Sequence, residues 1–148
     1  MQKLNFIPYN FRFKNSENKI YIFDIIRKKF VALQPEEWVR QHVVHHLIHQ
    51  KKYPKSLINV EKQLVINNLK KRYDVVVFKP DGSIAILIEC KAPEIEISQA
   101  TFDQIAKYNM QLDANFLMVT NGLHHFYCKI NAADNNYLFL QDIPDFNR

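Results

Sequence analysis

The chain has 148 residues, close to the common size of one globular domain, and 47% of them are hydrophobic, enough for a packed core. It contains no run of about 18 apolar residues and no signal-peptide pattern, so the sequence predicts neither a membrane segment nor secretion. Two cysteines argue against a disulfide framework and favour a reducing, cytoplasmic setting. A net charge of +5 and a pI near 9.2 favour an anionic partner.

The first third of the chain is expected to contain a short β-hairpin followed by a helix. Residues 1–33 are interpreted as an N-terminal β extension, with two apolar runs between Lys19 and Leu33 forming the hairpin. Pro35 suits the first turn of a helix, and Glu36 and Glu37 suit its positive end. The helix is predicted to run from residue 35 to about residue 50, with an apolar stripe at helical spacing that consists of Val39, Val43, Val44, Leu47 and Ile48.

Four histidines of this helix, His42, His45, His46 and His49, fall on the face away from the apolar stripe. No HExxH motif or cysteine pair accompanies them, so a zinc site is not indicated. We expect these four side chains to face solvent.

The rest of the chain predicts strands around a second helix. Strands are expected over 58–66, 71–79 and 84–91, then a helix over about 98–112 with Ser98 as its N-cap. Strands over 116–120 and 123–130 flank Asn121-Gly122, and residues 137–140 are expected to add an edge strand. These periodicities predict one mixed α/β or α+β domain over residues 1–148, with a core at 34–130 and a C-terminal strand and tail at 131–148.

The hairpin over residues 72–91 is expected to bring two acidic side chains together. Asp81-Gly82 is typical of a two-residue turn. If Pro80 then faces Ser83, Asp74 lies directly opposite Glu89. Alternation along the strand would put Glu89 and Lys91 on the face of Asp74 and turn Cys90 the other way. Two facing carboxylates need a cation, and a divalent metal with a lysine beside it is the simplest answer.

Two alternatives stay open from these residues alone. The carboxylates of Asp74 and Glu89 could form structural ion pairs with Arg72 and Lys91. A longer loop could also shift the pairing by one residue and place the two acids on opposite faces of the sheet.

The pattern of Asp74 followed by Glu89-Cys90-Lys91 resembles the active-site signature of the PD-(D/E)xK nuclease superfamily. Residues 104–108, Gln-Ile-Ala-Lys-Tyr, are similar to the QxxxY motif of RecB-like nucleases. Three further segments resemble the N-terminal domain of type I restriction enzyme R subunits in particular: residues 35–41, Tyr53-Pro54 and 120–122. The resemblance covers roughly residues 33–130 and implies a restriction-endonuclease-like fold, with a central mixed β-sheet flanked by helices.

The resemblance also implies roles for individual residues. Asp74, Glu89 and the main-chain carbonyl of Cys90 would bind Mg²⁺ or Mn²⁺, since hard cations prefer oxygen ligands. Lys91 would orient or deprotonate the attacking water. Two residues four apart on the second helix, Gln104 and Tyr108, would hydrogen-bond the phosphate backbone or support the lysine. The first helix would supply one more carboxylate, and the choice between Glu36 and Glu37 falls on Glu37.

Function is therefore expected to be metal-dependent hydrolysis of DNA phosphodiester bonds. The basic run Lys70, Lys71 and Arg72 leads into the strand that carries Asp74 and would hold the DNA backbone, although such runs are also ordinary solvated surface. The alternative is a non-catalytic module that binds nucleic acid or a protein partner on the same fold. Subunits of a restriction system are expected partners, and a homodimer of the junction-resolving kind is a further alternative.

Overall fold

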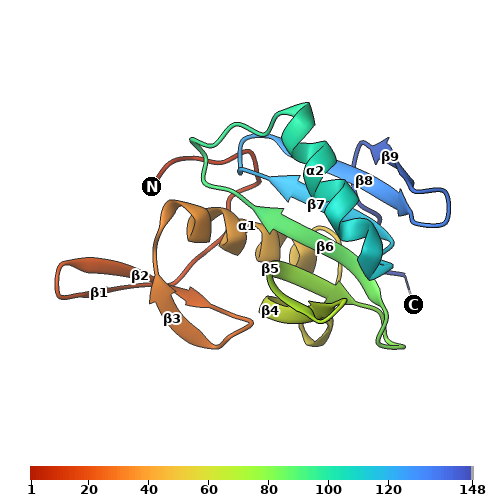
Figure 1. Ribbon diagram of the computed structural model, residues 1–148. Coiled ribbons are helices and arrows are strands. Elements are labelled where there is room, and N and C mark those ends of the chain that lie inside the picture. The colour runs from red at the N-terminus through yellow and green to blue at the C-terminus, as the bar shows by residue number, and fades with distance from the viewer. Residues whose placement is uncertain (148) are drawn as a thin grey trace.

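The computed structural model describes residues 1–147, apart from the side chains at positions 66 and 69. Its large sheet contains β4 (Ile58–Ile66), β5 (Leu69–Phe78), β6 (Ile84–Cys90), β7 (Phe116–Thr120), β8 (His125–Asn131) and β9 (Asn136–Leu140), side by side in that order. Only the β6–β7 pair is parallel, so this sheet is mixed. The predicted α/β (α+β) fold with a central mixed sheet is confirmed (Figure 1).

Two helices cover opposite faces of the large sheet. Helix α1 (Pro35–His49) contributes Val39, Val43 and Leu47 to one hydrophobic core, whose sheet residues include Val75, Ile86 and Ile88. Helix α2 (Gln99–Asn109) contributes Phe102 and Ala106 to a second core, whose sheet residues include Val76, Leu87 and Leu117. Side chains that alternate along β5 and β6 therefore supply both cores, which explains why these strands are apolar on both faces.

Helix α2 makes the crossover that the parallel β6–β7 pair requires. Its predicted cap is present, because the Ser98 hydroxyl accepts a hydrogen bond of 3.1 Å from the Thr101 amide. The helix ends at residue 109, and a 3₁₀ turn, η2 (Met110–Leu112), completes the predicted span. A second 3₁₀ turn, η1 (Lys55–Leu57), precedes β4.

The β5–β6 hairpin keeps the predicted register through a different turn. Val75 pairs with Ile88 and Val77 with Ile86, as a two-residue loop would require. However, the Lys79 amide donates to the carbonyl of Ser83 (2.8 Å), so the loop is one residue longer than predicted. An irregularity after Val77 compensates, because Phe78 pairs with Ile84 and one residue of β6 is skipped.

The N-terminal extension forms its own three-stranded antiparallel sheet, called the wing below, which projects beside α1 (Figure 1). It consists of β1 (Phe13–Ser16), β2 (Lys19–Asp24) and β3 (Lys29–Ala32). The predicted hairpin corresponds to β2 and β3. The sequence analysis missed β1, because this strand is largely polar and exposed and shows no apolar run.

Residues 1–12 lie along the side of α1 that turns away from the large sheet and cover its histidines. The ring centre of Phe11 lies 4.8 Å from those of both His42 and His45. These two side chains are only 6% and 7% exposed, and burial lowers their pKa values. The prediction of solvent-facing histidines is therefore wrong for both, and His46 is half-buried, whereas His49 is exposed. A helical wheel shows which face turns from the sheet, but not what covers that face.

Within the described residues, no helix combines the length and the apolar character that crossing a bilayer needs.

Candidate active site

Asp74 and the backbone of Cys90 are joined where β5 and β6 lie side by side. One carboxylate oxygen of Asp74, Oδ2, accepts a hydrogen bond of 2.8 Å from the Cys90 amide. The other oxygen, Oδ1, accepts one of 2.9 Å from Nη2 of Arg40 in α1. Asp74 is thus fixed between the strand that carries the Glu-x-Lys triplet and the helix that covers this face.

Glu89 lies close to Asp74 and is held by a different cation. Its Oε1 accepts a hydrogen bond of 3.0 Å from Nζ of Lys71. Burial raises the pKa of the Glu89 carboxyl and the negative charge of Asp74 raises it further, while Lys71 opposes both effects. The structure therefore brings together the two acids that the sequence predicted to face each other.

The regular alternation used in that prediction fails at Asp74. Tyr73 packs in the core under α2, whereas Val75, two residues later, packs in the core under α1. Across the strand pair, Glu61 of β4 has a positive φ of 58° between two regularly paired positions. Such a backbone is uncommon for a side chain larger than glycine and is costly in a strand. Because the strand changes faces here, Asp74 can reach Arg40 on one side of the sheet while Glu89 binds Lys71 toward the other.

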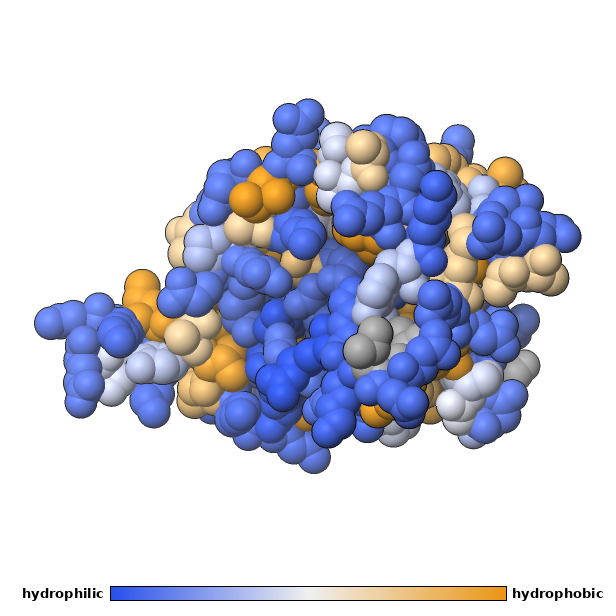
Figure 2. Space-filling view, in the orientation of Figure 1, coloured by the Kyte–Doolittle hydropathy of each residue, from blue (hydrophilic) through white to orange (hydrophobic). Residues whose placement is uncertain are grey.

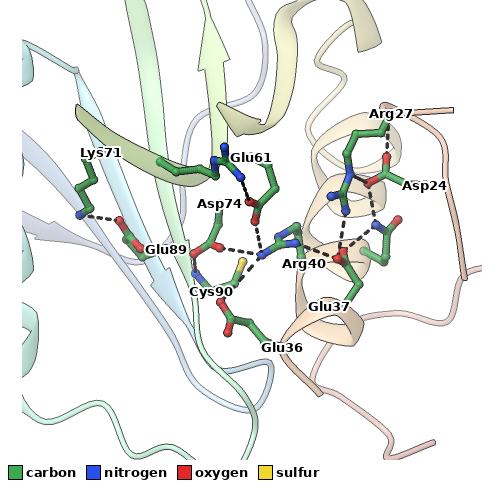
Figure 3. A network of polar contacts seen from close by, with 12 residues as sticks. Asp24, Arg27, Glu36, Glu37, Arg40, Glu61, Lys71, Asp74, Glu89 and Cys90 are labelled. Atoms are coloured by element: carbon green, nitrogen blue, oxygen red, sulfur yellow. Dashed lines mark hydrogen bonds and ion pairs between the residues drawn. The ribbon is translucent and has the colours of Figure 1, made fainter. Parts of the chain in front are cut away.

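Arg40 is the central residue of the site, and the sequence analysis did not identify it. Its Nη1 lies 2.8 Å from Oε1 of Glu37, and its Nη2 lies 2.8 Å from Oε1 of Glu61 and 2.9 Å from Oδ1 of Asp74 (Figure 3). Burial alone would lower the pKa of this guanidinium, but Glu37 and Asp74 outweigh burial and raise it. The only signal in the sequence is that Arg40 follows Glu37 by three residues and therefore shares its helix face.

A second layer of charges links this arginine to the wing. Asp24, fully buried at the end of β2, accepts hydrogen bonds from Arg27 Nε (2.7 Å) and Gln41 Nε2 (3.0 Å). Arg27 also reaches Oε1 of Glu37 at 3.0 Å. Acidic and basic groups thus alternate from the wing to β5, in the order Asp24, Arg27, Glu37, Arg40 and Asp74 (Figure 3).

The carboxylate of α1 that lies beside Asp74 is Glu36 rather than Glu37. Glu37 is 8% exposed, and both of its oxygens are occupied by Arg27, Arg40 and Gln41. Burial and then the charge of Asp74 raise the pKa of Glu36, while Arg40 and Lys91 oppose that rise. Glu37 therefore positions Arg40, and Glu36 borders the space that Lys91 also borders.

Lys91 follows directly after β6 and is anchored by its backbone. Its amide donates a hydrogen bond of 2.8 Å to the carbonyl of Thr120 at the end of β7. The side chain is half-buried and takes part in none of the ion pairs found among residues 1–147. The Lys91 charge acts on Glu36, and within the described residues its ammonium has no carboxylate partner.

Lys71, one of the three basic residues predicted to hold DNA, lies between Glu89 and two tyrosine rings. The Nζ atom of Lys71 is 4.5 Å from the ring centre of Tyr108 on α2 and 4.7 Å from that of Tyr73. Tyr108 itself is 43% exposed. Lys71 thus links the QxxxY helix to the acidic pair. Gln104 is exposed and makes no side-chain hydrogen bond within the described part of the chain.

The other two basic residues of this run remain at the surface. Lys70 is exposed, and Arg72 is exposed with its Nη1 3.6 Å from Oε2 of Glu61. Figure 2 shows hydrophilic side chains gathered over the middle of the face that contains the site.

The residues present fit a hard divalent cation. Asp74 and Glu89 supply oxygen donors, and each now has one oxygen on a cationic side chain that a metal could replace. Among residues 1–147 no three side chains of His, Cys, Asp or Glu form a ready metal cluster. Binding would therefore rest on two carboxylates, a main-chain carbonyl and ligands from water or substrate, as is usual for Mg²⁺.

Comparison with known proteins gives a family match and similar solved structures. A family model described as the type I restriction enzyme R protein N terminus (HSDR_N) matches residues 35–144. A solved structure of a candidate nuclease of the DUF820 group from Anabaena variabilis is similar, with a TM-score of 0.48 and 13% sequence identity. That alignment covers 86% of this chain and 75% of the other. A search of curated proteins finds no significant match.

Proposed function

The chain belongs to the family of type I restriction enzyme R protein N-terminal domains, and from this premise we propose that it is a Mg²⁺-dependent nuclease that hydrolyses phosphodiester bonds in DNA. Mn²⁺ would serve in place of Mg²⁺. The observation that supports this most directly is the closeness of Asp74 and Glu89, beside Glu36, on which the charges of both Asp74 and Lys91 act.

In this proposal Asp74, Glu89 and the carbonyl of Cys90 hold the cation. When bound, the metal would polarise the phosphate and acidify a water molecule. Lys91, whose ammonium is free of acidic partners among the described residues, orients that water and offsets charge on the phosphate oxygens. Hydrolysis forms a bond from the water oxygen to phosphorus and breaks one P–O ester bond, and the departing oxygen takes up a proton.

The surrounding residues would position rather than react. Tyr108 holds Lys71 against Glu89, and Gln104 is exposed next to it on α2 for contact with the phosphate backbone. Lys70 and Arg72 are exposed near the site and would attract DNA. Glu36, nearer to Asp74 than Glu37 is, would take the role first assigned to the helix carboxylate.

The test is a nicking assay on supercoiled DNA with Mg²⁺ or Mn²⁺ and with EDTA. Wild type should cleave only with metal, and Asp74→Asn and Lys91→Ala should be inactive although folded by circular dichroism. Lys129→Ala, an exposed change on β8, is the matched control and should cleave like wild type. Metal binding measured by calorimetry should be lost in Asp74→Asn but kept in Lys91→Ala. Full cleavage by both variants would remove the mechanism.

One observation favours a second function, a binding module without turnover. Arg40 and Lys71 already neutralise Asp74 and Glu89, so the site is electrostatically satisfied without a metal. Tight DNA binding in EDTA together with no cleavage under any divalent metal would favour the module. Subunits of a restriction system remain expected partners, and light scattering would show whether the chain forms a homodimer.

A further inference from the structure

One face of the wing combines exposed cations with half-buried aromatic rings. Ile22 and Asp24 are fully buried and define the inner face of β2, so Lys19, Tyr21 and Phe23 point outward. Residues of neighbouring segments that pair with Tyr21 or Phe23, or that stack on Phe23, lie on the same face. This set, called the outer face below, consists of Arg12, Lys14, Lys19, Tyr21, Phe23 and Phe30.

The cations of the outer face are held by aromatic rings instead of acids. The guanidinium carbon of Arg12 lies 4.5 Å from the ring centre of Phe23 and 5.6 Å from that of Phe30. Nζ of Lys14 lies 5.4 Å from the ring centre of Phe30. The two phenylalanine rings pack edge to face at 5.2 Å. A cation stacked on a ring keeps its charge and its N–H groups, so it can still donate to an anion.

The outer face differs from the candidate site in how its cations are balanced. Around the site Arg27, Arg40, Lys71 and Arg72 each have an acidic partner. By contrast, Arg12, Lys14 and Lys19 form no ion pair within the described residues. Three uncompensated cations with no acid on their own face suit a polyanion with regularly spaced charges.

Position connects the outer face with the candidate site. Asp24, at the inner face of the same strand, begins the ionic series that ends at Asp74. The wing therefore lies on the α1 side of the site (Figure 1), and Asp24 and Arg27 link it to that site (Figure 3). It also lies outside residues 35–144, the part of the chain that the family model matches.

We propose that the outer face of the wing binds the phosphate backbone of DNA beside the cleaved segment. This proposal rests on the proposed function for the identity of the anion. Arg12 and Lys14, held on Phe23 and Phe30, and Lys19 at the strand start each contact one phosphate. The contacts carry no base readout, so they add affinity for any sequence.

The test measures DNA binding in EDTA by fluorescence anisotropy, with a short labelled duplex, over a range of salt concentrations. Removing one cation that neutralises a phosphate should reduce the slope of log K against log salt by about 0.9. The double change Lys14→Gln and Lys19→Gln should therefore lower the slope by roughly 1.8, and adding Arg12→Gln should bring the reduction to roughly 2.7. Lys29→Gln, an exposed change in the same wing whose pairing partner Asp24 points inward, is the matched control and should leave the slope unchanged.

An unchanged slope in the triple variant, with the fold verified by thermal melting, would overturn the proposal. A reduction of the slope by about 0.9 in Lys29→Gln would also overturn it. The slope would then depend on the net charge of the protein rather than on the outer face. This result is separable from the proposed function. A lower slope in the variants without any metal-dependent cleavage by wild type would support DNA binding by the outer face and contradict the nuclease activity. Cleavage by wild type with an unchanged slope in the variants would support the nuclease activity and contradict DNA binding by the outer face.

Discussion

Replacing Arg40 by methionine removes the guanidinium but keeps a side chain of similar length. The Arg40 side chain is 9% exposed and lies within 3 Å of carboxylate oxygens from Glu37, Glu61 and Asp74. Removing one partner of a buried ionic group leaves uncompensated charge, which typically costs about 3–5 kcal/mol. We therefore expect the free energy of unfolding of the Arg40→Met variant to fall by that amount.

The measurement is urea denaturation at pH 7 in EDTA. Arg72→Met is the matched control, because Arg72 is 65% exposed and lies 3.6 Å from the same Glu61. An exposed pair contributes about 1 kcal/mol at most, so the control should be nearly neutral. A destabilisation of Arg40→Met no larger than that of Arg72→Met would refute the reasoning, since the network would then add nothing net to stability.

Added Mn²⁺ extends the same experiment. Without Arg40, a divalent cation is the remaining positive charge for Asp74, so Mn²⁺ should stabilise the Arg40→Met variant more than wild type. A ligand at one hundred times its dissociation constant stabilises a folded protein by about 2.7 kcal/mol. Equal stabilisation of both proteins would mean that metal and arginine do not share Asp74.

Three further predictions concern stability and reactivity. Burial, with smaller effects from His49 and His42, lowers the pKa of His45 from 6.5 to about 4. Below pH 6.5 the unfolded chain gains a proton that the folded protein does not, so the free energy of unfolding falls as pH falls from 6.5 toward 4. Linkage gives a decrease in stability of at most about 2 kcal/mol at pH 5, which urea titrations of wild type and His45→Phe would measure; equal pH profiles would contradict it. Burial also raises the pKa of Cys128 to about 12 and that of fully buried Cys90 well above its usual value, so neither thiol should react with Ellman's reagent until the protein unfolds. Gly122→Ala should cost about 1–3 kcal/mol more than Gly82→Ala in thermal or urea unfolding, because both glycines have positive φ but only a Cβ at residue 122 would lie 3.0 Å from neighbouring side chains.

Much of the large sheet could be predicted because its signals are local. Apolar runs bounded by turn residues located β4, β5 and β6 within a few residues, and Ser98 marked the start of α2. The closeness of Asp74 and Glu89 was also predicted from the register of the hairpin, whereas the regular alternation assumed for Asp74 was wrong. The register survived an error in the turn because the skipped residue of β6 cancelled the longer loop.

The missing parts of the site depend on contacts between segments far apart in the sequence. Arg40 resembles any polar residue of an amphipathic helix, and only the fold shows that Glu61 and Asp74 converge on it. Glu61 has a positive φ, which the sequence does not indicate because glutamate rarely adopts that backbone conformation. The choice between Glu36 and Glu37 likewise depends on where Arg27 lies, which helical periodicity does not contain.

The ionic series has a consequence for anyone trimming this protein. A fragment of residues 35–144, the part that the family model matches, would lack Asp24 and Arg27. Glu37 would then keep Arg40 but lose Arg27 as an ion-pair partner. The fragment would also lack Leu4, which belongs to the core under α1. We therefore expect a fragment of residues 35–144 to be less stable than the whole chain and to lose part of the cluster of charge around Glu37.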